Sequence, residues 1–172
     1  DADNALYSPD YRAPEKLFSQ LMQVSGRAGR SNIKGEVLIQ TAVPNNPVFE
    51  GIKNHNYEIF AQTLLREREQ MGLSPFSFSA ILRVESKQLK YGEQFVNDAA
   101  KYAESLSNKV VIYDPVRPSI ERLKGYERFQ LFIQADARKD LHNLLRQWVI
   151  YLRQYPLANR VKWSIDVDPI EF

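Results

Sequence analysis

Two hydrophobic periodicities run along this chain, one of two residues and one of between three and four. Alternating apolar and polar residues predict strands, which we place at 78–86, 126–134 and 161–168, with a short apolar strand at 110–113. Apolar residues at helical spacing predict helices, which we place at 91–107 and 137–154. Right-handed crossovers would put strands 78–86 and 126–134 at the centre of one sheet, with both helices on one face.

The order strand, helix, strand, strand, helix, strand indicates an α/β fold of the α+β kind, in the split βαβ or ferredoxin-like arrangement (βαββαβ). About 95 residues suffice for such a unit. We therefore predict that residues 76–172 form one domain. Its sheet has one face without helices, and that face is a candidate binding surface.

A different pattern precedes this domain. Residues 1–13 are rich in Asp, Pro and Tyr and are expected to form a loop. Pro14 then begins a helix, as proline favours the first helical turn, and this helix is predicted to end at Gly26. The apolar run within 36–41 predicts a strand.

One helix and one strand cannot bury a core by themselves. We therefore expect residues 1–45 to be one piece that packs on the rest of the chain or on a partner that this sequence does not contain. Its strand could instead pair with another chain, or the piece could stay disordered. A further helix is predicted at 52–70. It lies in a helical linker, 46–75, between the first piece and the C-terminal domain.

Composition narrows the class of protein. The 172 residues carry a net charge of +2, with 44% apolar and 26% charged residues, which is typical of a globular protein. The absence of cysteine excludes disulfides, thiolate zinc clusters and thiol nucleophiles. We find no apolar run of membrane-spanning length and no secretory signal, so a cytoplasmic location is expected. The start on Asp1-Ala2-Asp3 leads us to expect a longer parent protein.

The segment from Gln23 to Arg30 carries the most specific chemistry. Guanidinium groups are always charged and forked, so Arg27 and Arg30 suit phosphate oxygens. Gly26 and Gly29 have no Cβ and let the backbone approach an anion. A simple helix end would also combine glycine with a cation, but the complete Gln-x-x-Gly-Arg-x-x-Arg spacing favours a phosphate contact.

That spacing resembles the last motif of superfamily 2 helicases, whose arginines reach the γ-phosphate of ATP. The remaining sequence resembles the primosomal protein N′ (PriA) family of replication-restart helicases, in the segments 1–3, 9–13, 39–41, 75–76, 126–131 and 163–169. The resemblance implies that residues 1–45 are the end of a RecA-like helicase lobe 2. It also implies that Gln23, Gly26, Arg27 and Arg30 contact ATP and that the two arginines take part in hydrolysis.

For the parent protein, the resemblance implies an ATP-dependent 3′→5′ DNA helicase that recognises stalled or branched forks and restarts replication by assembling the primosome. The parent's cofactors would be ATP together with Mg and, separately, zinc. Its partners would be branched DNA, the acidic C-terminal tail of the single-stranded DNA-binding protein, and other primosome proteins. The phosphate loop, the acidic metal motif and the zinc cysteines of the family are missing from this sequence. We therefore expect the chain alone to be catalytically inactive.

A basic stripe lies on the predicted helix 137–154. Its members, at spacings that place them on one side of this helix, are Arg138, His142, Arg146 and Arg153. A solvated face of an amphipathic helix would have the same pattern, whereas a functional stripe would dock an acidic peptide or phosphates. The resemblance places the capture of the acidic tail at the start of this helix, which makes Arg138 the first candidate.

Two further candidates could bind DNA. The loop 114–125 carries Arg117, Arg122 and Lys124 between stiffening prolines, and it could contact a DNA backbone or be a plain surface loop. Tyr126 and Arg128 are expected on the open sheet face. This face could stack bases or pack against the rest of a helicase.

No metal site is expected. Asp166 and Asp168 share a strand face but have no third ligand, and His55 and His142 are isolated. Besides the helicase fragment, two classes stay open. One is a stand-alone, non-enzymatic nucleic-acid-binding or ribosomal-type module with a ferredoxin-like fold, and the other is a structural adaptor that binds no DNA.

Overall fold

The computed structural model describes residues 2–8, 10–28 and 36–169. Contacts between Cα atoms divide the chain into two compact units, Asp1–Glu67 and Arg68–Phe172. Gly29 and Arg30 of the predicted arginine motif lie outside the described residues. In the described part, no helix is both long and apolar enough to cross a membrane.

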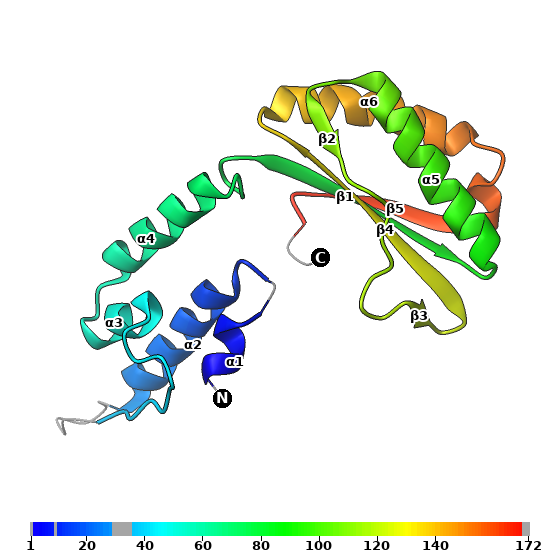
Figure 1. Cartoon of the computed structure of the whole chain (residues 1–172). Coiled ribbons are helices and arrows are strands. Elements are labelled where there is room, and N and C mark those ends of the chain that lie inside the picture. Colours follow the sequence, from blue (N-terminus) through cyan, green and yellow to red (C-terminus); the bar gives the residue numbers. More distant parts are fainter. Residues whose placement is uncertain (1, 9, 29–35, 170–172) are drawn as a thin grey trace. The chain divides into compact units, whose positions relative to one another are not determined.

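The second unit has the predicted split βαβ fold, with both helices on one face of the sheet (Figure 1). Its elements are β1 (Phe78–Ser86), α5 (Leu89–Leu106), β2 (Val110–Ile112), β3 (Arg122–Leu123), β4 (Tyr126–Ala135), α6 (Arg138–Gln154), a 3₁₀ turn (Ala158–Arg160) and β5 (Val161–Val167). The strand order is β2-β4-β1-β5, all antiparallel, with β3 paired to β4. The predicted central position of β1 and β4 is confirmed.

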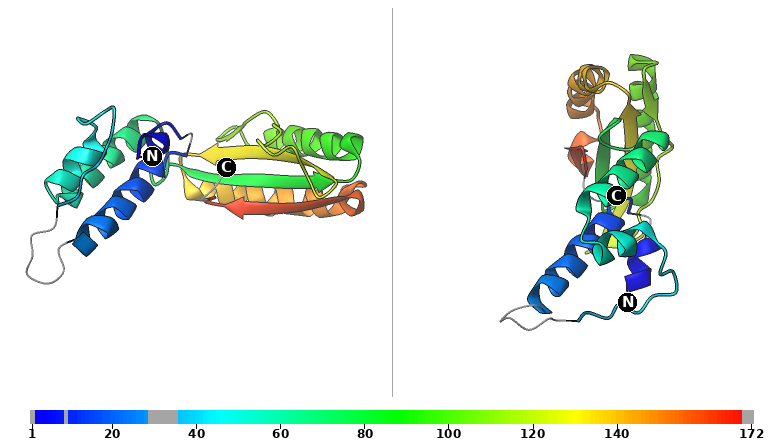
Figure 2. Two further views of the ribbon diagram at one scale, coloured as in Figure 1. Left: turned by 90° about the horizontal axis from the view of Figure 1, so that it is seen from below. Right: turned by 90° about the vertical axis from the view of Figure 1, so that its left-hand side faces the viewer.

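Alternation along the strands separates the core face from the open face. Leu82 of β1 lies opposite Leu131 of β4 and Ile165 of β5, so one row of apolar side chains crosses the sheet beneath the helices. Trp148 of α6 is fully buried in this core, and its indole N–H donates to the Ala99 carbonyl of α5 at 2.9 Å. The three strands β4, β1 and β5 are seen from the face without helices in Figure 2, left.

The predicted loop 114–125 is more ordered than its sequence indicates. Its last part forms a hairpin with β4, in which Lys124 and Gly125 have φ angles of 50° and 81°. Two positive φ angles between paired strands define a tight two-residue turn of the type that suits strand twist. Upstream, Val116 and Gln130 exchange backbone hydrogen bonds of 2.8 Å. The loop therefore follows the edge of β4.

The first unit is helical. Its elements are α1 (Ala2–Leu6), α2 (Ala13–Ala28), α3 (Pro47–Lys53) and α4 (Tyr57–Gln70). Phe18 of α2 stacks on Phe60 of α4, with ring centroids 4.5 Å apart, in an apolar cluster to which α3 also contributes. The predicted need of the first segment for a packing partner is thus met by the two helices that follow it.

Two predictions for the start of the chain were wrong. Residues 2–6 form α1 instead of loop, and α2 continues through Gly26 to Ala28. A glycine inside a helix costs about 1 kcal/mol relative to alanine. That cost does not end a helix unless the following residues adopt a capping conformation.

The predictions of a strand at 36–41 and of one helix at 52–70 were also wrong. Residues 36–41 form no strand; instead, the Asp3 carboxylate accepts hydrogen bonds from the Thr41 hydroxyl at 2.5 Å and from the Ala42 N–H at 2.9 Å. The helix divides into α3 and α4 because His55 has a φ of 49°. The Asn56 side chain then accepts from the Ile59 N–H at 3.1 Å and caps α4.

Candidate nucleic-acid and partner interfaces

The described part of the arginine motif lies at the solvent-exposed end of α2. Gln23, Gly26 and Arg27 are all exposed, and a Cβ at Gly26 would meet no atom within 4 Å. Gln23 and Arg27 are four residues apart in one helix, so they share a face. Neither side chain has a hydrogen-bond or ion-pair partner within the described residues. They are therefore available to an external phosphate, and Arg30 lies outside the described residues.

The predicted basic stripe occupies the solvent side of α6. Arg138, His142 and Arg146 are exposed, whereas Leu141 and Trp148 point into the core. The Arg138 guanidinium lies over the Phe78 ring, 5.0 Å from its centroid. This contact restricts Arg138 at the first residue of α6, where backbone N–H groups are not satisfied within the helix.

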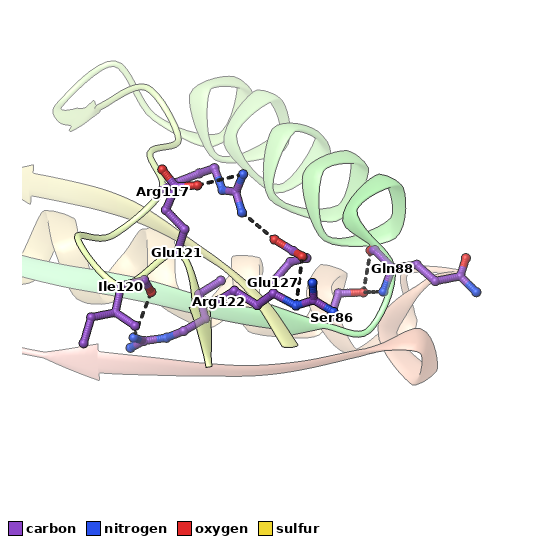
Figure 3. A network of polar contacts seen from close by, with 8 residues as sticks. Ser86, Gln88, Arg117, Ile120, Glu121, Arg122 and Glu127 are labelled. Carbon is purple, nitrogen blue, oxygen red and sulfur yellow. Dashed lines mark hydrogen bonds and ion pairs between the residues drawn. The ribbon is translucent and has the colours of Figure 1, made fainter. Parts of the chain in front are cut away.

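The arginines of the loop 114–125, here called the basic loop, are paired within the protein (Figure 3). Arg117 forms ion pairs with Glu121 at 2.9 Å and with Glu127. Arg122 lies 3.5 Å from the second carboxylate oxygen of Glu127. The two arginines and two glutamates cancel in formal charge, so among these predicted DNA contacts Lys124 alone adds a charge not balanced within this group.

The positive charges at the centre of the open sheet face are also paired with carboxylates. Arg128 lies 3.8 Å from Glu85 and donates to the Ile120 carbonyl at 3.2 Å. Arg83 lies 3.5 Å from Asp166. Ile81, two residues before Arg83 on the same side of β1, is 2% exposed. The face centre therefore offers little free positive charge.

Tyr126 lies in a different environment, at the end of the sheet where β4 and β5 begin. The Lys162 ammonium is 4.3 Å from the Tyr126 ring centroid, and the Lys87 ammonium is 5.9 Å from it. These residues border a pocket of about 340 Å³, which we call the lysine–tyrosine pocket; its other lining side chains include Tyr91 and Arg160. Among the residues that the structure describes, no carboxylate lines this pocket.

Sequence reasoning found Tyr126 but missed Lys87, Arg160 and Lys162. Arg160 and Lys162 are close in the sequence, but Lys87 lies 73 and 75 positions before them. The signal lies in the sheet register. Ser86 pairs with Glu127 and with Val161, so the next row across the three strands holds Lys87, Tyr126 and Arg160.

One hydroxyl anchors the connection that leads to this pocket. Tyr155, directly after α6, donates to the Asp98 carboxylate of α5. Burial and this hydrogen bond raise the pKa of Tyr155 to about 12. This hydrogen bond holds the end of α6 against α5. Arg160 of the pocket follows Tyr155 by five residues in the chain.

The described residues include no group of three or more His, Asp or Glu side chains that could hold a metal. The exposed, unpaired Arg27 fits the contact with nucleotide phosphates that the resemblance implies. The sequence contains no cysteine, so thiolate ligands for zinc would have to come from other sequence.

The strand order and the two helices on one face of the sheet define the second unit as an α+β domain of the split βαβ class. Residues 69–170 match the family described as primosomal protein N C-terminal domain, and the chain belongs to this family.

Relatives named "Replication restart protein PriA" match both units of the chain. Identity is 31% for the protein of Haemophilus influenzae, 30% for Bacillus subtilis and 37% for Synechocystis, over 98% of this chain in each case. The chain spans only 20–23% of the length of these relatives. Among solved structures, a de novo designed protein, Foldit4, aligns with 54% of the chain at 10% identity and a TM-score of 0.42, too low to support an argument.

Proposed function

We propose that this chain is the C-terminal part of an ATP-dependent 3′→5′ DNA helicase that restarts replication at stalled or branched forks by assembling the primosome. The match of residues 69–170 to the primosomal C-terminal domain carries the proposal. The similarity to replication restart proteins extends over 98% of the chain. It thus includes the arginine motif, which a stand-alone nucleic-acid-binding module does not need.

In the longer protein, the first unit would be the end of the second motor lobe. ATP, bound with Mg, supplies the γ-phosphoryl group. Gln23 and Gly26 would border this group, and Arg27 and Arg30 would stabilise its charge, a role in which an arginine contributes about 10³–10⁵ in rate. The exposed position of Arg27, without a partner in the described part, supports this assignment.

The second unit would bind DNA. Fluorescence anisotropy with forked and linear DNA at two salt concentrations tests this. We expect binding that weakens with salt, with a log–log slope of about −0.9 for each phosphate contact on duplex DNA. Absence of binding at both salt concentrations would contradict the proposal and favour the structural adaptor.

The same unit would capture the acidic tail of the single-stranded DNA-binding protein at the start of α6. Arg138 is exposed and held over Phe78, which supports a fixed contact for a carboxylate. Because a hydrogen bond to a charged group contributes about 1.5–3 kcal/mol, Arg138→Ala should weaken an acidic tail peptide by about tenfold or more in titration calorimetry. Lys101→Ala on the exposed side of α5 removes the same charge and should leave the affinity unchanged.

A further inference from the structure

We propose that the lysine–tyrosine pocket binds one nucleotide of single-stranded DNA, with the phosphate between Lys87, Arg160 and Lys162 and the base against Tyr126. This inference rests on the proposed DNA binding and assigns a site to it. The pocket lies at the end of the sheet where β4 and β5 begin.

Charge is the first argument. Lys87, Arg160 and Lys162 are exposed, and none forms an ion pair within the described residues. The neighbouring arginines Arg117 and Arg128, in contrast, each form an ion pair with a glutamate, whereas Lys162 lies opposite Glu85 in the strand register without pairing to it. A phosphate that enters the pocket could therefore contact three cations without first breaking an ion pair to a carboxylate. Converging cations of this kind attract a nucleic-acid backbone.

The backbone under these side chains is fixed. Ser86 is buried, and its hydroxyl donates to the Gln88 carbonyl at 2.8 Å and accepts from the Gln88 N–H at 3.2 Å, which holds the turn that carries Lys87 (Figure 3). Tyr126 follows the tight turn at Lys124 and Gly125 and pairs with Leu123. Such preorganisation lowers the ordering cost of binding.

The aromatic lining favours a nucleotide over an acidic peptide. Tyr126 and Tyr91 both border the pocket, and a ring beside unpaired cations matches the base and phosphate of one nucleotide. The lysine ammoniums near the Tyr126 ring have no stronger partner in the described part. A bound phosphate would be such a partner. The ammoniums would then move to the phosphate and leave the Tyr126 ring to stack on a base. Bases are available for such stacking in single strands and are covered by their neighbours in a duplex.

The affinity test uses the complete chain and a fluorescein-labelled oligothymidine. We expect the Lys87→Ala/Lys162→Ala variant to bind about tenfold more weakly, with a salt slope lower by about 0.7 for each phosphate that the variant no longer neutralises. Tyr126→Leu should lose at least about fivefold, because stacking is removed. The control, Lys101→Ala/Lys109→Ala, makes the same charge change at exposed positions outside the pocket and should bind like the parent chain. Circular dichroism checks that each variant is folded.

Photocrosslinking with an oligonucleotide that carries 5-iodouracil gives a second, independent result. An adduct on the peptide that contains Tyr126 or Tyr91 supports the inference. DNA binding that is equal in the pocket and control variants, with adducts elsewhere, overturns the inference and leaves the proposed function standing. Pocket variants that lose an acidic peptide but keep oligothymidine also overturn it. A chain that binds no DNA at all overturns both.

Discussion

The basic loop and the lysine–tyrosine pocket both border the first residues of β4, yet they use positive charge differently. In the basic loop, Arg117 and Arg122 both form ion pairs with Glu127, which lies on β4 in the hairpin that ends the loop. In the pocket, Lys87 and Lys162 approach the ring of Tyr126, and the described lining of the pocket contains no carboxylate.

The difference shows that a count of basic residues does not give the number of cations without an ion-pair partner. A forked guanidinium readily holds a carboxylate in a fixed geometry, so the arginines tie the basic loop to the sheet. The lysines have flexible stems and remain unpaired in the described part. The ion pairs of Arg117 and Arg122 thus support the structure of the basic loop, whereas Lys87, Arg160 and Lys162 are the cations that we propose for DNA binding.

Charge reversal should separate the two regions most strongly. Lys162→Glu should weaken the binding of single-stranded DNA by more than about tenfold, because it removes one phosphate contact and adds repulsion. Arg122→Glu makes the same change of charge in the basic loop and should cost less than about threefold. Anisotropy titrations of both variants give the answer. Equal losses would contradict the distinction between the regions.

Releasing the paired arginines should have a smaller effect in the opposite direction. Glu127→Gln removes the carboxylate that Arg117 and Arg122 share. We expect DNA affinity to rise about threefold, because Arg122 is freed and Arg117 keeps only its pair with Glu121, so phosphate attraction increases. Glu104→Gln on exposed α5 is the control for net charge. If both variants gain equally, the pairing has no local influence.

The smallest expected effect is a loss of folded-state stability at alkaline pH. It would act through the hydrogen bond between Tyr155 and Asp98, which anchors the connection to the pocket. The pKa of Tyr155 is raised from its ordinary value of 10.0 to about 12, first by burial and then by the hydrogen bond to Asp98. Because the folded state favours the neutral phenol, this stability is present below pH 10 and is lost as the pH rises towards 12.

Denaturant titrations across this pH range, followed by tryptophan fluorescence, measure the loss, since Trp148 and Trp163 are the two tryptophans of the chain and both lie in the second unit. Tyr155→Phe should lose less stability over the same range. Tyr7→Phe, at an exposed site of the first unit, should behave like the parent chain. An identical pH profile for Tyr155→Phe would exclude Tyr155 as the group that titrates.

Hydrophobic periodicity was sufficient for the fold of the second unit. Residues such as Leu82, Leu131 and Ile165 alternate with polar neighbours, and the crossover rule then placed β1 and β4 centrally. In the first unit the same reasoning failed for the apolar residues 36–41. An apolar run predicts burial, but strand pairing needs an available edge, and the described residues of the first unit include no strand to supply one.

The candidate sites were predictable only in part. The stripe on α6 follows from spacing along one helix, so Arg138 and His142 were found with the correct exposure. The pairing of Arg117 with Glu127 depends on how the basic loop returns along β4, which no local pattern reveals. The convergence of Lys87 with Lys162 likewise depends on strand register.

The path of the basic loop along β4 also bears on self-association. Beyond the three residues of β2, this edge of the sheet contains Pro115 and Pro118, with Val116 pairing to Gln130 between them. Proline has no N–H, so the edge presents no regular row of donors to a strand from another molecule. These two prolines therefore hinder strand addition at this edge, whereas β5 forms the opposite edge of the sheet without a proline.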